Sequence, residues 1–202
     1  MRFLRILTLA SSVSAGSLGS GGPGGTKCLK QRHVDTLVEA YKSILTQWEP
    51  SMADILADDG FFDYSDSINT VAGLATGFPI FPNKTDFIAH QTDAVRLFAS
   101  MFSTGPTIPS IGTNSRVQPD SLPLSIVEVG PWNCGQITVI WSATFTGVPG
   151  GTPLPVRGIT VIEAKYSRKE DQFQIQSLKV EFNSMNFYRN IGGVCERPAP
   201  PP

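Results

Sequence analysis

Charged residues, histidines and cysteines are all scarce in this sequence. Asp, Glu, Lys and Arg together make up 16% of the 202 residues, and the formal net charge is −1 at pH 7. Proteins that bind nucleic acid concentrate Lys and Arg in a patch or stripe, and this sequence has no such cluster. Its apolar stretches are shorter than the ~20 residues that a membrane-spanning helix needs. We therefore predict neither a nucleic-acid partner nor a membrane span.

The sequence also lacks the short ligand spacings of a metal site. Its three cysteines, Cys28, Cys134 and Cys195, are far apart in the chain. Asp58 and Asp59 form an acidic pair, but adjacent side chains point apart, so we interpret them as the charged end of a helix. We predict no metal and no cofactor.

The N-terminus has the pattern of a secretory signal peptide over residues 1–15. Arg2 precedes an apolar run, and residues 13–15 (Val-Ser-Ala) are a small-residue ending that suits signal peptidase. A buried first helix is the alternative, but a Gly/Ser-rich linker over residues 16–27 follows at once. We predict a secreted, extracellular protein.

If the protein is exported, its cysteines can form a disulfide and its one sequon can be glycosylated. In an oxidising compartment, three cysteines are most simply one disulfide and one free thiol, and the sequence alone leaves three pairings open. Asn83-Lys84-Thr85 is an acceptor sequence for N-glycosylation, which makes Asn83 a predicted glycan site.

Helical periodicity marks the first half of the chain. Apolar residues recur every three or four positions over Leu29–Trp48, which predicts an amphipathic helix that Pro50 ends. Ser51–Ala57 opens with a capping-box pattern at Ser51 and predicts a second, short helix. A third helix is predicted to start at Asn83 as its N-cap, after a loop over residues 65–82.

Strand patterns dominate the second half. Two runs of β-branched and aromatic residues within Val156–Ser184 flank the polar turn Ser167–Gln172, which predicts a long antiparallel hairpin. Further strands are predicted over Gly60–Tyr64, Leu124–Val129 and Ile137–Phe145. Helices followed by an antiparallel sheet predict one α+β domain over residues 28–190, with a proline-rich tail over residues 191–202.

In this order and spacing, the elements resemble the nuclear-transport-factor-2-like superfamily of ketosteroid isomerases, scytalone dehydratases and SnoaL-type polyketide cyclases. The resemblance rests on the first helix, LADDGFFDYSDSIN (56–69), FPNKTDFIAHQ (81–91), VRGITVIEA (156–164) and VEFNS (180–184). The sequence looks most like the secreted fungal members. The resemblance implies a cone-shaped fold, in which three N-terminal helices pack on a strongly curved antiparallel sheet around an apolar pocket. It also implies a disulfide between Cys28 and Cys134.

The functional residues of these relatives match only in part. In ketosteroid isomerases a tyrosine of the first helix donates to the oxyanion, and Tyr41 matches it if one gap is allowed. The general-base aspartate falls on Tyr64, with Asp63 one residue away and expected to point outward. The second oxyanion donor, an aspartate in that family, falls on Thr160.

The histidines do not match either. Scytalone dehydratases use paired pocket histidines, whereas His33 and His90 belong to different predicted helices. His33 falls on the polar side of its helix, and we interpret His90 as a surface or hydrogen-bonded histidine. Tyr41 also has a simpler interpretation, as a core aromatic residue whose hydroxyl finds one partner.

The concave face of the predicted sheet is the expected ligand site. Its candidate pocket residues are Tyr41, Tyr64, Trp141, Thr160, Ile162, Val180 and Phe182. We favour a secreted protein that binds an apolar small molecule without catalysis, because the acid–base pair of the relatives is incomplete. The alternative is a cofactor-independent lyase, isomerase or cyclase that acts on a small polyketide-like substrate. On the opposite, convex face, Ile140, Ile159 and Val161 predict a homodimer.

Overall fold

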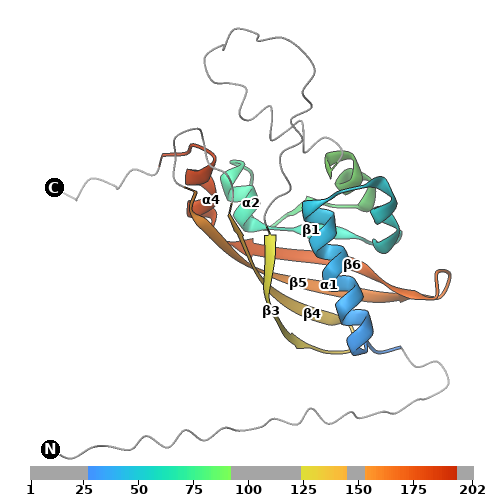
Figure 1. Ribbon diagram of the computed structural model, residues 1–202. Helices are drawn as coiled ribbons and strands as arrows, with labels where there is room; N and C mark the ends of the chain where they lie inside the picture. Colours follow the sequence, from blue (N-terminus) through green and yellow to red (C-terminus); the bar gives the residue numbers. More distant parts are fainter. Residues whose placement is uncertain (1–26, 92–123, 145–152, 195–202) are drawn as a thin grey trace, which may run out of the picture.

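A computed structural model of the chain describes residues 27–91, 124–144 and 153–194 (Figure 1). The predicted signal peptide, nearly all of the linker, Cys195 and the end of the tail lie outside these residues. None of the helices within them is long and apolar enough to cross a membrane.

Four long strands, each antiparallel to the next along the chain, form most of the sheet. They are β3 (Leu124–Trp132), β4 (Gln136–Thr144), β5 (Pro155–Ser167) and β6 (Gln172–Phe182). The β5–β6 pair confirms the predicted hairpin, with Thr160 opposite Val180. Along β5 the side chains alternate as predicted, because Thr160 and Ile162 are buried whereas Ile159 is exposed.

The sheet is mixed rather than antiparallel. Two short strands, β1 (Phe62–Tyr64) and β2 (Pro79–Phe81), extend it to six strands in the order β2-β1-β6-β5-β4-β3. β1 is antiparallel to β2 but parallel to β6. The antiparallel prediction is wrong at this edge, because β1 comes from the helical half of the chain and meets β6 through a long connection, as parallel strands require.

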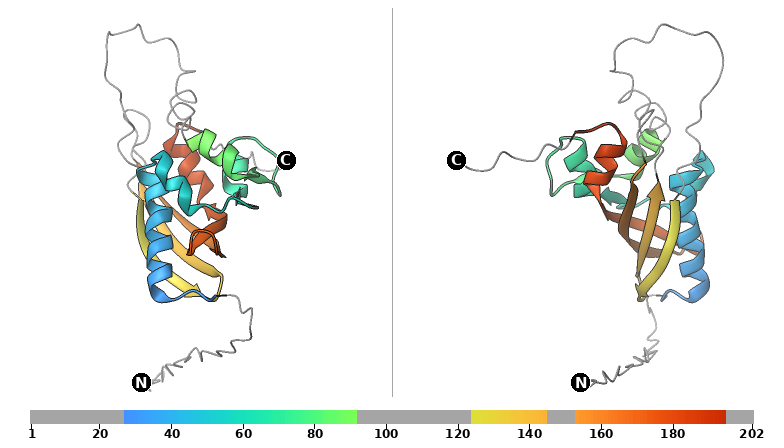
Figure 2. Two further views of the ribbon diagram at one scale, coloured as in Figure 1. Left: turned by 90° about the vertical axis from the view of Figure 1, so that its right-hand side faces the viewer. Right: turned by 60° about the vertical axis from the view of Figure 1, so that its left-hand side comes forward.

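The helix α1 (Gln31–Thr46) packs on one side of the sheet, which we call the α1 face (Figure 2). This confirms the first predicted helix, two residues shorter at each end. Its buried residues recur at helical spacing: Val34, Leu37, Val38, Tyr41 and Ile44. The α1 face therefore forms the core between helix and sheet.

The next two helical segments differ from each other in how they begin. η1 (Pro50–Ile55) is a 3₁₀-helix with Glu49 at the N-cap position and no side-chain cap. The capping box predicted at Ser51 is wrong, because Pro50 starts the helix and has no N–H that needs a partner. Residues 84–91 are helical, and Asn83 is the N-cap, as predicted, since its Oδ1 accepts from the Asp86 N–H at 2.8 Å.

Two short helices have no counterpart in the predictions. α2 (Asp66–Val71) lies in the predicted loop 65–82, and α4 (Ser184–Asn190) follows β6 and contacts α2 (Figure 1). Ser65 caps α2 and Asn183 caps α4 through their side-chain oxygens. Helices of six and seven residues show too few turns for a periodic apolar pattern. The predicted set of three N-terminal helices therefore omits two helices, α2 and α4.

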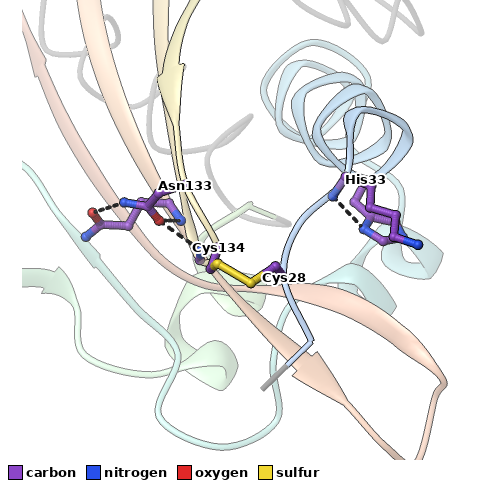
Figure 3. The surroundings of a disulfide bond; sticks show 7 residues. Cys28, His33, Asn133 and Cys134 are labelled. Atoms are coloured by element: carbon purple, nitrogen blue, oxygen red, sulfur yellow. Dashed lines mark hydrogen bonds between the residues drawn. A yellow bond between two sulfur atoms is a disulfide. The ribbon is translucent and has the colours of Figure 1, made fainter. Parts of the chain in front are cut away.

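A disulfide joins Cys28 to Cys134 (Figure 3). It links the start of α1 to the turn between β3 and β4, where the Leu29 N–H also donates to the Cys134 carbonyl at 3.2 Å. In that turn, Asn133 Oδ1 accepts from the N–H groups of Gly135 and Gln136. The bond therefore fixes α1 on the sheet, in agreement with the pairing that the resemblance implies.

Candidate functional site

Three of the predicted pocket residues form one buried hydrogen-bonded cluster on the α1 face. The hydroxyl of Tyr41 on α1 lies 2.7 Å from Thr160 Oγ1 on β5. Trp141 on β4 donates its indole N–H to the same Thr160 oxygen at 3.0 Å. Tyr41 and Thr160 are fully buried, and burial raises the pKa of the Tyr41 hydroxyl. The cluster therefore ties the helix to two strands through one threonine.

One hydroxyl hydrogen of this cluster has no acceptor within the cluster. Thr160 Oγ1 accepts from Trp141, and only one hydroxyl hydrogen lies between Thr160 and Tyr41. Within the described residues, no other acceptor is hydrogen-bonded to either hydroxyl. One of the two O–H groups is therefore able to donate to a further oxygen on the α1 face.

Gly158 determines where the Trp141 indole lies. The two residues are directly opposite on β5 and β4, and a Cβ on Gly158 would come within 2.2 Å of the indole ring. The absence of a side chain at Gly158 leaves room for the indole ring over β5. Phe182, opposite Gly158 on β6, packs against the indole with ring centroids 6.1 Å apart.

Asp63 on β1 is buried on the α1 face, which contradicts the expectation that it points outward. It is opposite Leu178 on β6 and Phe81 on β2, and it is only 6% exposed. Its Oδ1 has no hydrogen-bond partner. Burial raises the pKa of Asp63 to about 7, partly opposed by a hydrogen bond from the Tyr64 backbone.

The error at Asp63 has an identifiable cause. Its neighbours Phe62 and Tyr64 are aromatic, so alternation seems to bury them and to expose the aspartate between them. Phe61, however, lies two residues before Asp63 and therefore on the same side of the strand. Phe61 is buried, whereas Phe62 and Tyr64 are only half-buried. Three of the residues 61–64 are aromatic, so alternation allows either side of this strand to be the buried one. Phe61 was the signal for the correct side.

The remaining candidate pocket residues separate into two groups. Ile162 is fully buried on the α1 face, and Val180 and Phe182 are half-buried there. Tyr64 is not part of this group. Its hydroxyl donates to Asp66 Oδ2 at 2.8 Å, a local contact at the start of α2.

The histidines and the acidic pair make local contacts in the structure. His33 Nδ1 accepts from the Lys30 N–H at 3.0 Å (Figure 3), and burial lowers the pKa of His33. His90 is exposed and packs on Phe81. Asp58 forms an ion pair with Lys84 at 2.8 Å. In the three described stretches, His, Cys, Asp and Glu do not cluster as metal ligands.

An aromatic cluster borders Asp63. Phe87, from the helical residues 84–91, contacts Phe61 and Phe81 edge-on, with ring centroids 5.2 and 5.5 Å apart. Its third aromatic neighbour is Trp48, at 6.0 Å. The Trp48 Nε1–H is buried and has no hydrogen-bond partner. Trp48 Nε1 and Asp63 Oδ1 are the two buried side-chain atoms without a partner among the described residues.

A shallow groove of about 260 Å³ lies elsewhere, between α1, η1 and the start of β6. Its lining includes Ala40, Met52, Ile55 and Gln172. It contains none of the predicted pocket residues.

The fold and the order of its elements agree with a family match. The chain belongs to the NTF2-like domain family, whose model matches residues 27–194. No curated protein matches the sequence.

Solved structures are similar at low sequence identity. The Kfla4162 protein from Kribbella flavida is 15% identical, with 79% of this chain and 96% of that chain covered and a TM-score of 0.49. A protein described as a SnoaL-like polyketide cyclase, from Shewanella denitrificans OS-217, is 8% identical, with 80% and 97% covered and a TM-score of 0.48. A ketosteroid isomerase-like protein from Erwinia carotovora atroseptica SCRI1043 is 11% identical, with 73% and 86% covered and a TM-score of 0.36.

Proposed function

We propose that the protein is a cofactor-independent enzyme that moves a proton on a small apolar molecule, with Asp63 as the general base. The observation that carries this proposal is the Asp63 carboxyl group, which is buried on the α1 face with one oxygen unpartnered. The sequence alone favours binding without catalysis, because it reveals no general base. Asp63 supplies that group.

The energetics of Asp63 favour a functional role over a structural one. A buried carboxylate without an ion-pair partner destabilises the folded protein, because its charge loses the solvation of water. Within the described residues, no Lys, Arg or His pairs with Asp63. Groups with pKa values moved toward neutrality by burial are typical of general acids and bases.

The proposed step needs only this chain's residues. The Asp63 carboxylate takes a proton from a carbon next to a substrate carbonyl, and the electron pair of the broken C–H bond forms an enolate. The spare hydroxyl hydrogen of the Tyr41–Thr160 pair is a donor for the negative oxygen. Asp63, now protonated, returns the proton to a second carbon or oxygen. Isomerisation, dehydration and ring closure all begin in this way.

The test uses 2-tetralone, an uncharged aromatic ketone with acidic hydrogens beside its carbonyl. We expect the full-length protein to accelerate exchange of these hydrogens with deuterium in D₂O, measured by NMR. Asp63→Asn should reduce the acceleration about a hundredfold or more, the usual scale for a general base. Asp59→Asn, at an exposed position, is the matched control and should exchange like the wild type. Equal exchange with Asp63→Asn would refute the assignment.

The second candidate function is binding of an apolar small molecule without turnover. The observation in its favour is that Tyr41, Thr160 and Trp141 already bond to one another, as a structural cluster would. Binding of 2-tetralone without any proton exchange would support this function instead.

We further propose that the protein is exported and glycosylated at Asn83. The disulfide fits an oxidising compartment. Asn83 is exposed, and its Oδ1 caps the helix while its Nδ2 donates to Asp86 Oδ2 at 2.8 Å. A glycan on Nδ2 would keep the cap. Peptide mass spectrometry of protein from the culture medium tests both proposals, and an unmodified Asn83 in intracellular protein would refute them.

A further inference from the structure

We infer that the α2–β2 loop (residues 72–79) and the adjoining helix α4 form a docking surface for a phospholipid bilayer. Apolar side chains of the loop and of α4 enter the bilayer, and Arg189 binds a lipid phosphate. This inference goes beyond the proposed function and does not depend on it, because Asp63, Tyr41 and Thr160 take no part in the docking surface.

The first support is the distribution of exposed apolar side chains. Four of the nine large apolar residues that are exposed in the described stretches belong to these two segments. Leu74 and Phe78, 55% and 64% exposed, are in the α2–β2 loop. Met185 and Tyr188, 61% and 39% exposed, are on α4, which contacts α2 (Figure 1). Large apolar side chains gathered on one exposed surface are typical of a binding surface.

The α2–β2 loop is held in a defined conformation. Asn69, buried on α2, accepts from the Leu74 N–H through its backbone carbonyl at 2.8 Å. The side-chain amide of Asn69 donates to the Phe78 carbonyl at 3.0 Å. A Cβ on Gly73 or Gly77 would meet no atom within 4 Å, so the loop stands clear of the rest of the described protein. The loop therefore presents its two apolar side chains on a fixed scaffold.

The second support is the charge pattern. Every residue of the α2–β2 loop is exposed and uncharged, and Thr76 is its one polar side chain. Residues 182–194, which include α4, contain no acid and one cation, Arg189. Arg189 is exposed and forms no ion pair within the described residues. Acyl chains accept apolar side chains, and phosphates bind a guanidinium group, so the two segments match the two layers of a phospholipid surface.

These properties favour a lipid surface over other partners. Protein interfaces form about one hydrogen bond per 100–200 Å², and the α2–β2 loop has one polar side chain to contribute. Binding of nucleic acid requires several cations, and this surface has one. Asp66 and Glu181, the acids at the start of α2, both accept from backbone N–H groups, which offsets part of their repulsion of lipid phosphates.

Leu74→Ser with Phe78→Ser tests the apolar part of the docking surface. We expect the full-length wild type to co-sediment with vesicles of phosphatidylcholine and phosphatidylglycerol. The double variant should bind at least about tenfold more weakly, because it lacks two side chains that the bilayer buries.

Val127→Ser with Val129→Ser is the matched control. These side chains are also exposed, but they are on β3, at the opposite edge of the sheet from β2. The control should bind vesicles like the wild type. Both double variants should melt like the wild type, because they change only exposed side chains.

Arg189→Gln tests the polar contact. One cation close to an anionic bilayer strengthens binding about fivefold, so the variant should lose about that factor on vesicles that contain phosphatidylglycerol. On phosphatidylcholine alone its affinity should change less than about twofold.

Phe78→Trp reports directly whether the loop enters the bilayer. The variant keeps a large apolar side chain and should bind vesicles like the wild type. Its additional tryptophan emission should shift to the blue on binding and be quenched by lipids with brominated acyl chains. Val127→Trp should show neither change.

The outcomes separate this inference from the alternatives. A wild type that does not bind vesicles, or a double variant Leu74→Ser, Phe78→Ser that binds like the wild type, would overturn it. If that variant instead converts a dimer to a monomer and vesicles are not bound, the surface is a contact between two copies and the lipid assignment is wrong. The same variant should keep the wild-type exchange rate with 2-tetralone, so failure of vesicle binding and failure of the proposed function are distinguishable.

Discussion

Thr160 Oγ1 lies 2.7 Å from the Tyr41 hydroxyl and thereby joins α1 to the central strand of the sheet. Because Trp141 donates to the same oxygen, Thr160 has two hydrogen-bond partners among the described residues, whereas Tyr41 has one. This difference makes the two residues unequal in their effect on stability.

Thr160→Val should therefore destabilise the fold more than Tyr41→Phe. The valine leaves the buried Tyr41 hydroxyl and the Trp141 N–H unpaired, at a cost of about 1–3 kcal/mol each. Tyr41→Phe leaves Thr160 still bonded to Trp141 and should cost about 1 kcal/mol. Chemical denaturation measures both. Equal losses would show that Thr160 does not bridge the two aromatic residues.

Gly158→Ala should displace the Trp141 indole from β5. The new Cβ would lie 2.2 Å from the ring, so the indole must rotate and lose its bond to Thr160. We expect a loss of about 2 kcal/mol or more, typical of an overpacked core, together with a changed tryptophan fluorescence spectrum. Gly130→Ala, whose Cβ would meet Thr138 atoms at 3.5 Å, is the milder control.

Asp63 should make the folded protein less stable as pH rises. Its pKa is about 7 in the folded state and 3.8 in the unfolded state, so between these pH values the folded chain binds more protons. The free energy of unfolding therefore falls across this window, by about 4 kcal/mol from this group. Asp63→Asn should remove the fall and be the more stable protein at pH 8.

Comparing the free energy of unfolding across pH distinguishes an effect of the raised Asp63 pKa from a general effect of the substitution. Urea denaturation of both proteins at several pH values measures it. A constant difference between Asp63→Asn and the wild type from pH 4 to pH 8 would contradict a raised Asp63 pKa.

The Cys28–Cys134 bond should stabilise the domain by about 5 kcal/mol, the chain-entropy value for a loop of its length. Its sequence separation is 106 residues. We expect Cys28→Ser with Cys134→Ser to lower the melting temperature and to loosen the start of α1. Hydrogen exchange at residues 31–34 provides the measurement. Unchanged protection there would show that side-chain packing alone holds the helix.

The face of the sheet opposite the α1 face should mediate a homodimer. Ile159 is 50% exposed at its centre, opposite Ile140 on β4. Ile159→Lys should convert the dimer to a monomer in sedimentation experiments at micromolar concentration. Val194→Lys changes another exposed apolar residue outside this face and should remain dimeric. A monomeric wild type would exclude this interface.

The elements with long periodic patterns could be predicted from the sequence. α1 and the β5–β6 hairpin extend over enough residues for periods of 3.6 and 2 to be distinguished. The register of the hairpin does not follow from the turn alone, because an irregularity between Glu163 and Ala164 shifts the pairing by one residue and places Thr160 opposite Val180. The resemblance also supplied Tyr41 and Thr160 as a pair.

The buried position of Asp63 could not be predicted in the same way. β1 has three residues, and its direction relative to β6 depends on a pairing across more than half of the chain. That pairing fixes the side on which Asp63 lies, whereas local alternation allows either side unless Phe61 is taken as the buried residue. The sequence also does not indicate that the Trp48 N–H lacks a hydrogen-bond partner, because that depends on the surrounding structure.

The dependence of the 2-tetralone exchange rate on pH tests the central claim most directly. If Asp63 is the base, the rate in D₂O should rise with pH, reach half of its maximum near pH 7 and level off above it. Asp63→Asn should lack this inflection. A wild-type rate that equals the buffer rate, or an inflection that Asp63→Asn retains, would contradict the account.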